Sequence, residues 1–435
     1  MNKEIFRIAI PNIISNITVP VMGLISTGII GDWSGSAAVI GALALGGSIF
    51  NFIYFNCSFI RMGTSGLTAQ AYGAGDFHET TLLLVRAIFV AVAISLLVLI
   101  LQRPLGEFAL WMMEGDDMVA EHFFARIWAV PAGVSLFALY GWFVGMQNAT
   151  IPMAVSISVN LLHIFFGWWF VYSFDLGIAG IAYASVASQW IGVVLAVVLL
   201  LIFFRRKLQK ITLGEIFDIE GMKRFFKVNG DIVVRTFCNV CVYTFFTAAS
   251  ARMGNAAILA VNTILMQLLM LFSYMNDGFA YAAEALTGRF IGARDGRSLR
   301  ECVKKCMVWC MVVGVAYVGV YVGWWRELLG IFVDSNQANA SSLIELAGSY
   351  IGWVIAIPLA CSIPFLLDGV MIGATQTRVM RDAMLLSTVA FFALFYGLQP
   401  IIGNNALWLA FTSYMFLRGV FQYFMTQRLE NIYKV

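Results

Sequence analysis

The chain has 435 residues, of which 61% are hydrophobic and 12% are charged, and its formal net charge is +3 at pH 7. The mean hydropathy is +0.85. Soluble domains carry about 25% charged residues, so this composition excludes a soluble globular protein. The small net charge also gives no indication of nucleic-acid binding. A spanning helix needs about 20 mostly apolar residues, and the length therefore predicts about twelve spans joined by short loops.

Apolar runs place these spans in chain order, and charged residues, Gly or Pro mark their ends. The pattern predicts an all-α integral membrane protein with twelve transmembrane helices. We expect no cleaved leader, because Met1 to Glu4 run directly into the first span. The spans are expected at residues 8–31, 38–60, 80–101, 123–146, 152–174, 178–204, 228–252, 257–288, 303–325, 346–373, 383–402 and 406–427.

Charges are unequally divided between the two sets of loops, and positive residues favour the cytoplasmic side. We expect a multi-pass protein of the plasma membrane (the bacterial inner membrane) with both termini cytoplasmic. The inner positive residues would be Lys3, Arg7, Arg61, Arg86, those of segments 205–227 and 289–305, Arg378, Arg381, Arg428 and Lys434. The outer loops would hold Arg103, Arg126, Arg252 and Arg326 with Glu107, Glu114, Asp116, Asp117, Glu121, Asp175, Glu327 and Asp334.

The two halves of the chain resemble each other on either side of the long polar segment 205–227. Residues 67–76 correspond without a gap to residues 286–295, and Gly141-x-x-x-Gly145 recurs as Gly369-x-x-x-Gly373. Six spans in each half give the halves the same orientation. The pattern predicts two pseudo-symmetric six-helix lobes, 1–210 and 211–435, around a central cavity. The glycines are also consistent with close helix packing alone.

Three carboxylates lie deep in spans of the second half, where a charge costs at least about 2.5–3.5 kcal/mol. Asp277 and Glu284 are two helical turns apart and share one helix face. Asp368 follows Pro364, which removes a backbone donor and loosens the helix. We expect the three to bind the coupling ion or a cationic substrate, with Asp277 and Asp368 as candidates for Na⁺. The alternative is that they pair with Arg235, the only deep cation that we identify, or cap broken helices.

The first half has no deep carboxylate, and His163 is its most interesting polar residue because imidazole titrates near physiological pH. His163 is therefore a candidate for ion coupling. The alternative is a neutral histidine that hydrogen-bonds between helices. Polar and adaptable apolar residues on inner spans are candidates for the wall of a substrate cavity. They are Ser26, Asn160, Ser185, Tyr140, Met266 and Tyr274.

Enzymatic and metal-binding signatures are missing from the sequence. It contains neither G-x-x-x-x-G-K-[ST] nor H-E-x-x-H. The seven Cys fit small apolar packing positions better than a disulfide or metal framework. We therefore expect no catalytic residue, no enzyme activity, no metal and no cofactor. Energy for any transport must then come from an ion gradient, H⁺ or Na⁺, or from the gradient of the substrate itself.

Four stretches together make the chain resemble the multidrug and toxic compound extrusion (MATE) family, and within it the DinF-like branch. The resemblance covers nearly the whole chain. It implies two six-helix lobes, alternating access, and export of small organic compounds, cationic or amphiphilic, in exchange for H⁺ or Na⁺. We expect a monomer in the lipid bilayer with a small-molecule substrate and no nucleic acid. The stretches are residues 11–20, 61–70, 260–293 and 368–375.

The sequence departs from the DinF-like pattern at the usual proton site of the first lobe. Members usually carry an Asp in span one, where this chain has Ser26. The Asn-x-x-x-Asp of span five is replaced by His163 and Gly167, and the Thr of span six by Ser185. Either the second-lobe carboxylates now carry the ion, as the resemblance to the NorM-like branch suggests, or His163 replaces the lost acids.

Three other functions stay open at the level of the sequence. A lipid-linked precursor flippase of the same superfamily would need a basic cavity, whereas the deep ionisable residues that we identify here are mostly acidic. A polytopic membrane enzyme would need a catalytic cluster at the membrane interface, and we find none. An uncoupled carrier or sensor would explain why the usual acids are missing.

Overall fold

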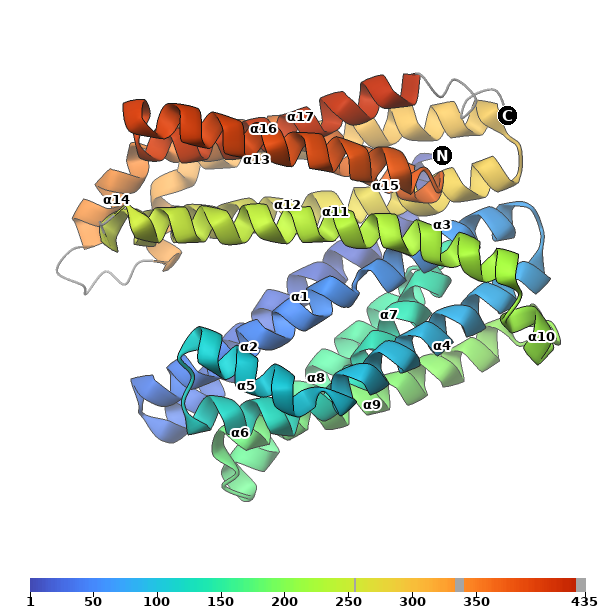
Figure 1. The fold of residues 1–435 in the computed structure, drawn as a ribbon, viewed down its shortest axis with the longest axis horizontal. Coiled ribbons are helices and arrows are strands. Elements are labelled where there is room, and N and C mark those ends of the chain that lie inside the picture. Colours follow the sequence, from blue (N-terminus) through green and yellow to red (C-terminus); the bar gives the residue numbers. More distant parts are fainter. Residues whose placement is uncertain (254–255, 333–339, 428–435) are drawn as a thin grey trace. The chain divides into compact units, whose positions relative to one another are not determined.

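The computed structural model describes residues 1–253, 256–332 and 340–427, so Asp334, Arg428 and Lys434 of the charge pattern lie outside the described residues. All regular structure within these residues is helical (Figure 1). The elements are α1 (Asn2–Ser34), α2 (Ala37–Cys57), α3 (Phe59–Gly73), α4 (Phe77–Ile100), α5 (Gln102–Met113), α6 (Asp117–Arg126), a 3₁₀ turn (Ile127–Ala129), α7 (Val130–Gly145), α8 (Thr150–Ser173), α9 (Gly177–Phe204), α10 (Leu213–Ile216), α11 (Ile219–Arg252), α12 (Ala256–Gly292), α13 (Gly296–Phe332), α14 (Ala340–Gly348), α15 (Ile351–Gly373), α16 (Thr377–Ile402) and α17 (Asn404–Gln427).

Eleven helices or helix pairs of the described residues are long and apolar enough to cross a membrane. The pairs α2–α3 and α6–α7 each form one span. The twelfth predicted span is α17, which is long enough but carries the polar Asn404, Arg418 and Gln422. The predicted architecture of twelve spans in two six-helix lobes is confirmed.

The chain forms two compact units. One comprises residues 10–229 and is called the N lobe below, and the other comprises residues 1–9 and 230–435 and is called the C lobe. The division between them falls inside α11. The lobe limits 1–210 and 211–435 that the sequence suggested stay a prediction.

In the N lobe, α7 packs against α3, α4 and α9. The aromatic rings of Trp142, Phe143 and Phe204 contact one another in its core. The indole Nε1 of Trp142 donates a hydrogen bond of 2.8 Å to the carbonyl of Thr80, so the buried indole is not left without a partner. Large apolar side chains such as Val194 on α9 remain exposed, as a lipid-facing surface requires.

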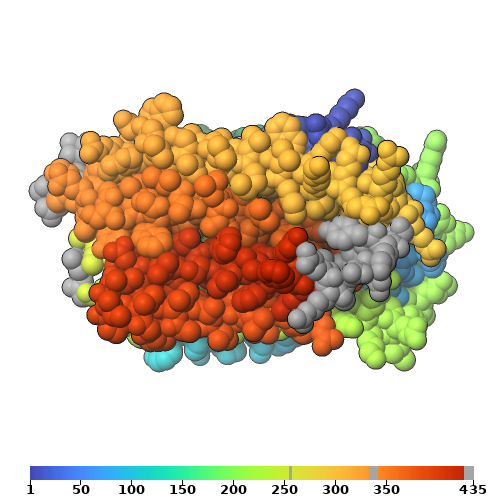
Figure 2. All heavy atoms as spheres, turned by 90° about the horizontal axis from the view of Figure 1, so that it is seen from above, coloured from blue at the N-terminus to red at the C-terminus, as the bar shows by residue number. Residues whose placement is uncertain are grey.

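In the C lobe, α12 packs on α15, and α15 and α16 both pack on α17. Trp408 and Phe411 of α17 lie against Phe246 of α11 in its core. The face in Figure 2 is covered largely by side chains from the last third of the chain. Exposed apolar residues on α13 and α16, such as Val312 and Val389, fit contact with acyl chains.

The repeat that the glycines indicated is visible in how the helices cross. A Cβ at Gly141 would press on the carbonyl of Arg61, and one at Gly369 would press on that of Ala280. One turn later, Gly145 meets the carbonyl of Ser65. Gly373 likewise meets the carbonyl of Glu284. The corresponding residues of the two lobes therefore form the same close crossing, α7 on α3 and α15 on α12.

The turns after these helices also repeat. Asp76 accepts a hydrogen bond from the backbone N–H of Glu79 at 2.9 Å, and Asp295 accepts one from Ser298 at 3.0 Å. Each aspartate follows a residue with positive φ, Gly75 or Arg294. Both carboxylates thus cap the next helix, which explains why these positions match in the sequence.

Candidate functional site

Three of the predicted site residues come together in the N lobe, on α1, α8 and α9. His163 is buried, with 4% of its surface exposed. Its Nε2 lies 3.0 Å from the hydroxyl of Ser26, and its Nδ1 lies 3.3 Å from the hydroxyl of Ser185. Of the four residues that the resemblance places at the family's usual proton site, these three therefore form one hydrogen-bonded triad.

Partners of the two hydroxyls determine where the protons of the triad can lie. Ser26 donates to the carbonyl of Met22 at 3.0 Å, so its oxygen accepts from Nε2–H of His163. Ser185 has two acceptors at 3.3 Å, Nδ1 of His163 and the carbonyl of Ile181. It donates to Nδ1 when the imidazole is neutral. When Nδ1 is protonated, Ser185 accepts from it and donates to Ile181, so every hydrogen bond is satisfied in both charge states.

The surroundings of the triad hold α1 and α8 close together. Asn160, about one turn from His163, donates a hydrogen bond of 2.8 Å to the hydroxyl of Thr18 on α1. Gly167, one turn further, is buried, and a Cβ there would lie 3.2 Å from the side chain of Ile181. Asn160 therefore lies beside the triad, and its predicted role in a substrate cavity stays a prediction.

Arg126 was expected in an outer loop, but it ends α6 inside the fourth span. Its half-buried guanidinium lies 4.8 Å from the ring centroid of Phe50 and has no carboxylate partner among the described residues. Within residues 10–229, no described carboxylate is classed as buried. Arg86 is buried and Arg126 is half-buried, so the least exposed charges of this lobe are positive.

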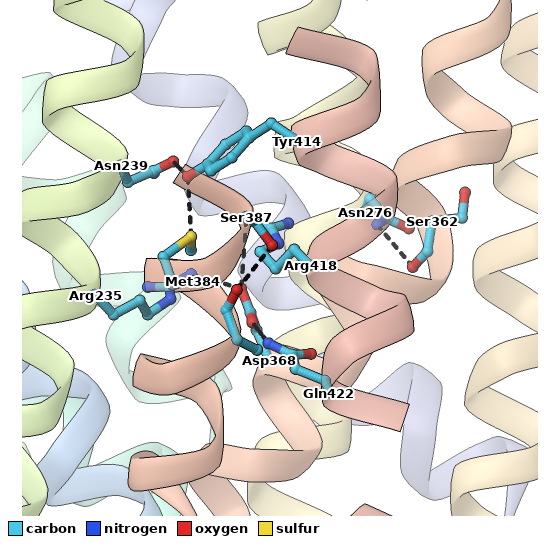
Figure 3. Close-up of polar contacts among 11 residues, drawn as sticks. Arg235, Asn239, Asn276, Ser362, Asp368, Met384, Ser387, Tyr414, Arg418 and Gln422 are labelled. Atoms are coloured by element: carbon cyan, nitrogen blue, oxygen red, sulfur yellow. Dashed lines mark hydrogen bonds and ion pairs between the residues drawn. The ribbon is translucent and has the colours of Figure 1, made fainter. Parts of the chain in front are cut away.

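In the C lobe, Asp368 of α15 lies in a charged network, which Figure 3 shows. Arg235 of α11 donates to its Oδ2 at 2.6 Å, and Gln422 of α17 donates to its Oδ1 at 2.5 Å. The Nη1 of Arg418 lies 3.7 Å from Oδ2. One carboxylate thus joins three helices, and the predicted alternative that it pairs with Arg235 is what the geometry shows.

Arg418 is a functional candidate that the sequence reasoning missed. It has only 1% of its surface exposed and lies 4.8 Å from the ring centroid of Phe365. The prediction that Arg235 is the only deep cation was therefore wrong. A single arginine inside the apolar run of the last span was the available signal, because a charge at that depth requires a partner.

Asp277 and Glu284 both lie on α12 but in different surroundings. Asp277 is half-buried, whereas Glu284 is buried at the crossing with α15, where its carbonyl faces Gly373. The neighbouring Asn276 donates to the carbonyl of Ser362 at 3.5 Å. Among the described residues, no group of three or more His, Cys, Asp or Glu is arranged to hold a metal ion.

The remaining candidates for a substrate cavity are half-buried. Tyr140 packs on the N-lobe core. Met266 packs on the C-lobe core. Tyr274 lies three residues before Asp277 on α12. Their role in binding stays a prediction.

A cavity of about 710 Å³ lies in the N lobe between α4, α10 and the start of α11, away from the triad. Arg86 extends from α4 and donates to the carbonyls of Glu215 and Ile216, at 2.7 and 3.0 Å. Glu215 accepts from Thr212, and Asp218 caps α11 through Gly221. These contacts anchor the polar linker to α4, and that explains the charges lining the cavity.

Known proteins are similar to this chain over nearly its whole length. The MatE family model matches residues 11–169 and 232–397. DNA damage-inducible protein F of Escherichia coli is 33% identical over 426 residues, which cover 96% of this chain and 90% of that protein. The chain belongs to the MATE family. The predicted DinF-like resemblance is thereby confirmed.

Solved MATE structures have the same fold. The eukaryotic MATE transporter AtDTX14 superposes with a TM-score of 0.83 at 19% identity, covering 98% of this chain and 95% of the other. A transporter of the MOP superfamily from Pyrococcus furiosus, whose binding pocket has reverse polarity, gives 0.85 at 17% identity, covering 100% and 97%. This MATE protein is therefore a multi-pass membrane transporter of small molecules, and its relatives are transporters rather than enzymes.

Proposed function

We propose that this MATE protein exports amphiphilic organic compounds in exchange for protons, and that His163 carries the proton. The observation that supports this proposal is the Ser26–His163–Ser185 triad. It accepts a proton on Nδ1 of His163 without losing a hydrogen bond, because the Ser185 hydroxyl turns from Nδ1 to the carbonyl of Ile181. By the resemblance to the DinF-like branch, Ser26 stands where relatives usually carry an Asp, and His163 and Ser185 stand where they usually carry the Asn and Thr of the same proton site.

The charge of His163 explains why proton and substrate would be exchanged. With His163 neutral, a substrate that is neutral or carries one positive charge meets only the fixed charge of Arg126, which lies within electrostatic reach of His163. A proton on His163 adds a second positive charge in a medium of low dielectric constant, and this weakens cation binding. Proton and substrate then favour opposite states of the transporter, and each shifts the equilibrium only through its differential affinity.

Asp368 is the less favourable carrier of the coupling ion. Two arginines and Gln422 already occupy its carboxylate oxygens. A proton or Na⁺ would have to displace these partners and leave buried guanidinium groups unpaired, at a cost of about 3–5 kcal/mol. We assign Asp368 a structural role, which leaves Asp277 and Glu284 as the remaining carboxylates of the C lobe for a Na⁺-coupled alternative.

We place the protein in the bacterial inner membrane with both termini in the cytoplasm. The positive-inside pattern of the loops supports this orientation. The ends of α6, α8 and α9 at Asp117, Ser173 and Gly177 then face outward. The anchored linker, residues 205–218, then faces the cytoplasm.

The test is drug-driven proton movement in proteoliposomes, followed with a pH-sensitive dye with and without Na⁺. His163→Gln should abolish substrate-dependent proton release, because Gln cannot bind a proton at neutral pH. Ser188→Ala is the matched control, since Ser188 is buried one turn from Ser185 but bonds only a backbone carbonyl. Na⁺-dependent transport that survives His163→Gln would refute the proposal and favour the carboxylates of α12.

A flippase of lipid-linked precursors is the second candidate. Arg126 favours it, because a half-buried guanidinium without a carboxylate partner suits a phosphate. The reverse polarity of the binding pocket in the Pyrococcus furiosus transporter suggests a different function for that protein as well. Arg126→Gln should then abolish transbilayer movement of a fluorescent polyprenyl pyrophosphate, whereas it should increase export of a cationic dye if the protein is the proton-coupled exporter.

A further inference from the structure

The polar segment 205–227, which comprises the anchored linker and the first turns of α11, also carries large apolar side chains that the N lobe leaves uncovered. Leu213 is 75% exposed and Ile219 is 81% exposed. Phe217, between them in the chain, is half exposed. Apolar side chains grouped in this way on a polar segment mark a surface that meets an apolar partner. The proposed proton exchange gives this surface no role.

The polar segment lies where the lipid-facing surface of the N lobe begins. Figure 1 shows α10 at one end of this lobe, beside α4. The ring of Phe217 meets that of Phe89 on α4 edge-on, with centroids 5.1 Å apart. Arg86, one turn before Phe89, holds the α10 backbone at this level through its two hydrogen bonds. Phe89 is the first of the large exposed apolar residues of α4, and it is followed by Val92, Leu96, Leu97 and Ile100.

The two helices that the polar segment joins indicate the same level. On α9, the large exposed apolar residues end at Phe203, and the exposed Arg205 follows within one turn. On α11, Ile219 and Phe226 are exposed two turns apart on one face, and the exposed Lys223 lies between them. Exposed apolar and exposed basic side chains therefore meet at the inner ends of both helices, as is typical of a headgroup region.

The charges of the polar segment are sorted between two sides. It has seven Lys and Arg but only three Asp and Glu, and the structure describes all of its residues. The three acidic residues all line the cavity between α4, α10 and α11, whereas Arg224 is the only one of the seven basic residues that does so. The outer side is therefore both apolar and positive. Its exposed basic residues, which have no carboxylate partner in the described parts of the chain, are Arg205, Arg206, Lys210, Lys223 and Lys227.

We propose that the polar segment is a membrane-surface anchor that binds anionic phospholipids of the cytoplasmic leaflet. Leu213, Phe217 and Ile219 enter the boundary between headgroups and acyl chains, and the exposed lysines and arginines contact the lipid phosphates. The negative surface of that leaflet complements the charge of the segment. An acidic protein would also match this charge, but the apolar side chains lie level with the start of the lipid-facing surface of α4, where acyl chains cover them.

The proposal goes beyond the proposed exchange, because it depends on the orientation in the membrane but not on the coupling ion. Its test measures lipid binding to the purified chain in a neutral detergent, with phosphatidylglycerol or phosphatidylcholine added to the micelles and melting followed by tryptophan fluorescence. Phosphatidylglycerol should raise the melting temperature more than phosphatidylcholine does. Salt at about 1 M should reduce the difference, because it screens the exposed charges.

Neutralising three exposed lysines of the polar segment should weaken the apparent affinity for phosphatidylglycerol about tenfold or more. The substitutions are Lys210→Gln, Lys223→Gln and Lys227→Gln. A matched control removes three exposed positive charges from segment 289–305 of the C lobe, and it should bind phosphatidylglycerol as the wild type does. Its substitutions are Arg297→Gln, Arg300→Gln and Lys304→Gln. Equal losses in the two variants would mean that only the net charge matters, and the proposed anchor would be wrong.

The apolar part of the anchor is tested by Leu213→Ser combined with Ile219→Ser. Both side chains are exposed, so the fold should persist, and melting in detergent without lipid verifies this. Binding of both lipids should weaken, because both offer acyl chains; unchanged binding would refute the anchor. Inorganic phosphate should give no stabilisation, and an effect equal to that of phosphatidylglycerol would identify a phosphate site instead. The assay needs no ion gradient, so its outcome is independent of the result with His163→Gln.

Discussion

Asp368 is the residue on which most of the buried charge of the C lobe depends. Arg235, Arg418 and Gln422 all direct polar groups at its two oxygens from other helices. A buried ion pair gives little net stability over apolar packing, but removing one member leaves its partners unpaired. The network is therefore costly to break, even though its gain over apolar packing is small.

Asp368→Asn should lower the free energy of unfolding by about 3–5 kcal/mol, because two buried guanidinium groups lose their counter-charge. Melting temperature in detergent, followed by tryptophan fluorescence, measures the change. Asp382→Asn is the control: Asp382 pairs with Arg381 at 2.7 Å but is 38% exposed, so the loss there should be about 0–1 kcal/mol. Equal losses in the two variants would contradict the structural role of Asp368. Proton coupling should persist in the folded fraction of Asp368→Asn.

At this scale the sequence indicated which polar residues are buried but not how they pair. Ser26, His163 and Ser185 were predicted from their places in the family pattern, and they do meet. Arg418 was missed because an arginine in a predicted span was not matched with the aspartate of another. Hydroxyl directions, such as those of Ser26 and Ser185, depend on backbone carbonyls whose positions only the folded helices define.

At the scale of elements, the two glycine crossings set how closely α7 approaches α3 and how closely α15 approaches α12. At Gly145 and Gly373 the facing atoms include the backbone carbonyls of Ser65 and Glu284, which cannot move aside as a flexible side chain can. The same crossing in both lobes explains why the small-xxx-small pattern recurs in the sequence.

Gly145→Ala and Gly373→Ala should each destabilise the protein by about 1–3 kcal/mol, because the added methyl group must push two helices apart. Gly47 and Gly397 have nothing within 4 Å of the position that a Cβ would occupy, and they provide a control in each lobe. Alanine there should be neutral or stabilise by up to about 1 kcal/mol, since alanine favours helix. Thermal melting of the four variants measures these changes in stability. If alanine at Gly47 and Gly397 lowered the melting temperature as much as at Gly145 and Gly373, the tight crossings would not explain the effect.

The cap that Asp295 forms at the start of α13 makes a pH-dependent contribution to the stability of the fold. Hydrogen bonds from Ser298 hold the pKa of Asp295 below its ordinary value. A lowered folded-state pKa means that the cap stabilises the fold above the unfolded value, about 3.9, and is lost as the pH falls through the folded value. Asp295→Ala should thus lower the melting temperature at neutral pH, and the difference from wild type should shrink on acidification. A difference independent of pH would contradict the charged cap.

At the scale of the whole molecule, twelve spans were predictable from hydropathy and loop charge. The first and last residues of each helix were less predictable. Helix α1 extends from Asn2 to Ser34, beyond the predicted 8–31, because polar ends of a spanning helix continue into the headgroup region. Arg126 was counted with the outer loops, although the predicted span 123–146 contains it. In the structure the ring of Phe50 accommodates it, a contact that sequence spacing does not reveal.

The orientation in the membrane is testable by labelling with a membrane-impermeant maleimide. Cysteine introduced at exposed Asp117 should react in intact cells, and cysteine at exposed Lys210 should react only after the cells are permeabilised. The chain without an added cysteine is the control, because six of its seven cysteines are buried. The reverse pattern would invert the proposed topology.

The triad at His163 also has an electrical consequence. A carboxylate that binds a proton passes from negative to neutral, whereas the imidazole of His163 passes from neutral to positive. The deprotonated site then adds no charge of its own to the step that carries substrate outward, whereas the protonated site carries one positive charge inward. A membrane potential contributes about 2.3 kcal/mol per elementary charge for each 100 mV. An inside-negative potential would therefore accelerate the proton-loaded step and leave the outward step with a neutral substrate almost untouched.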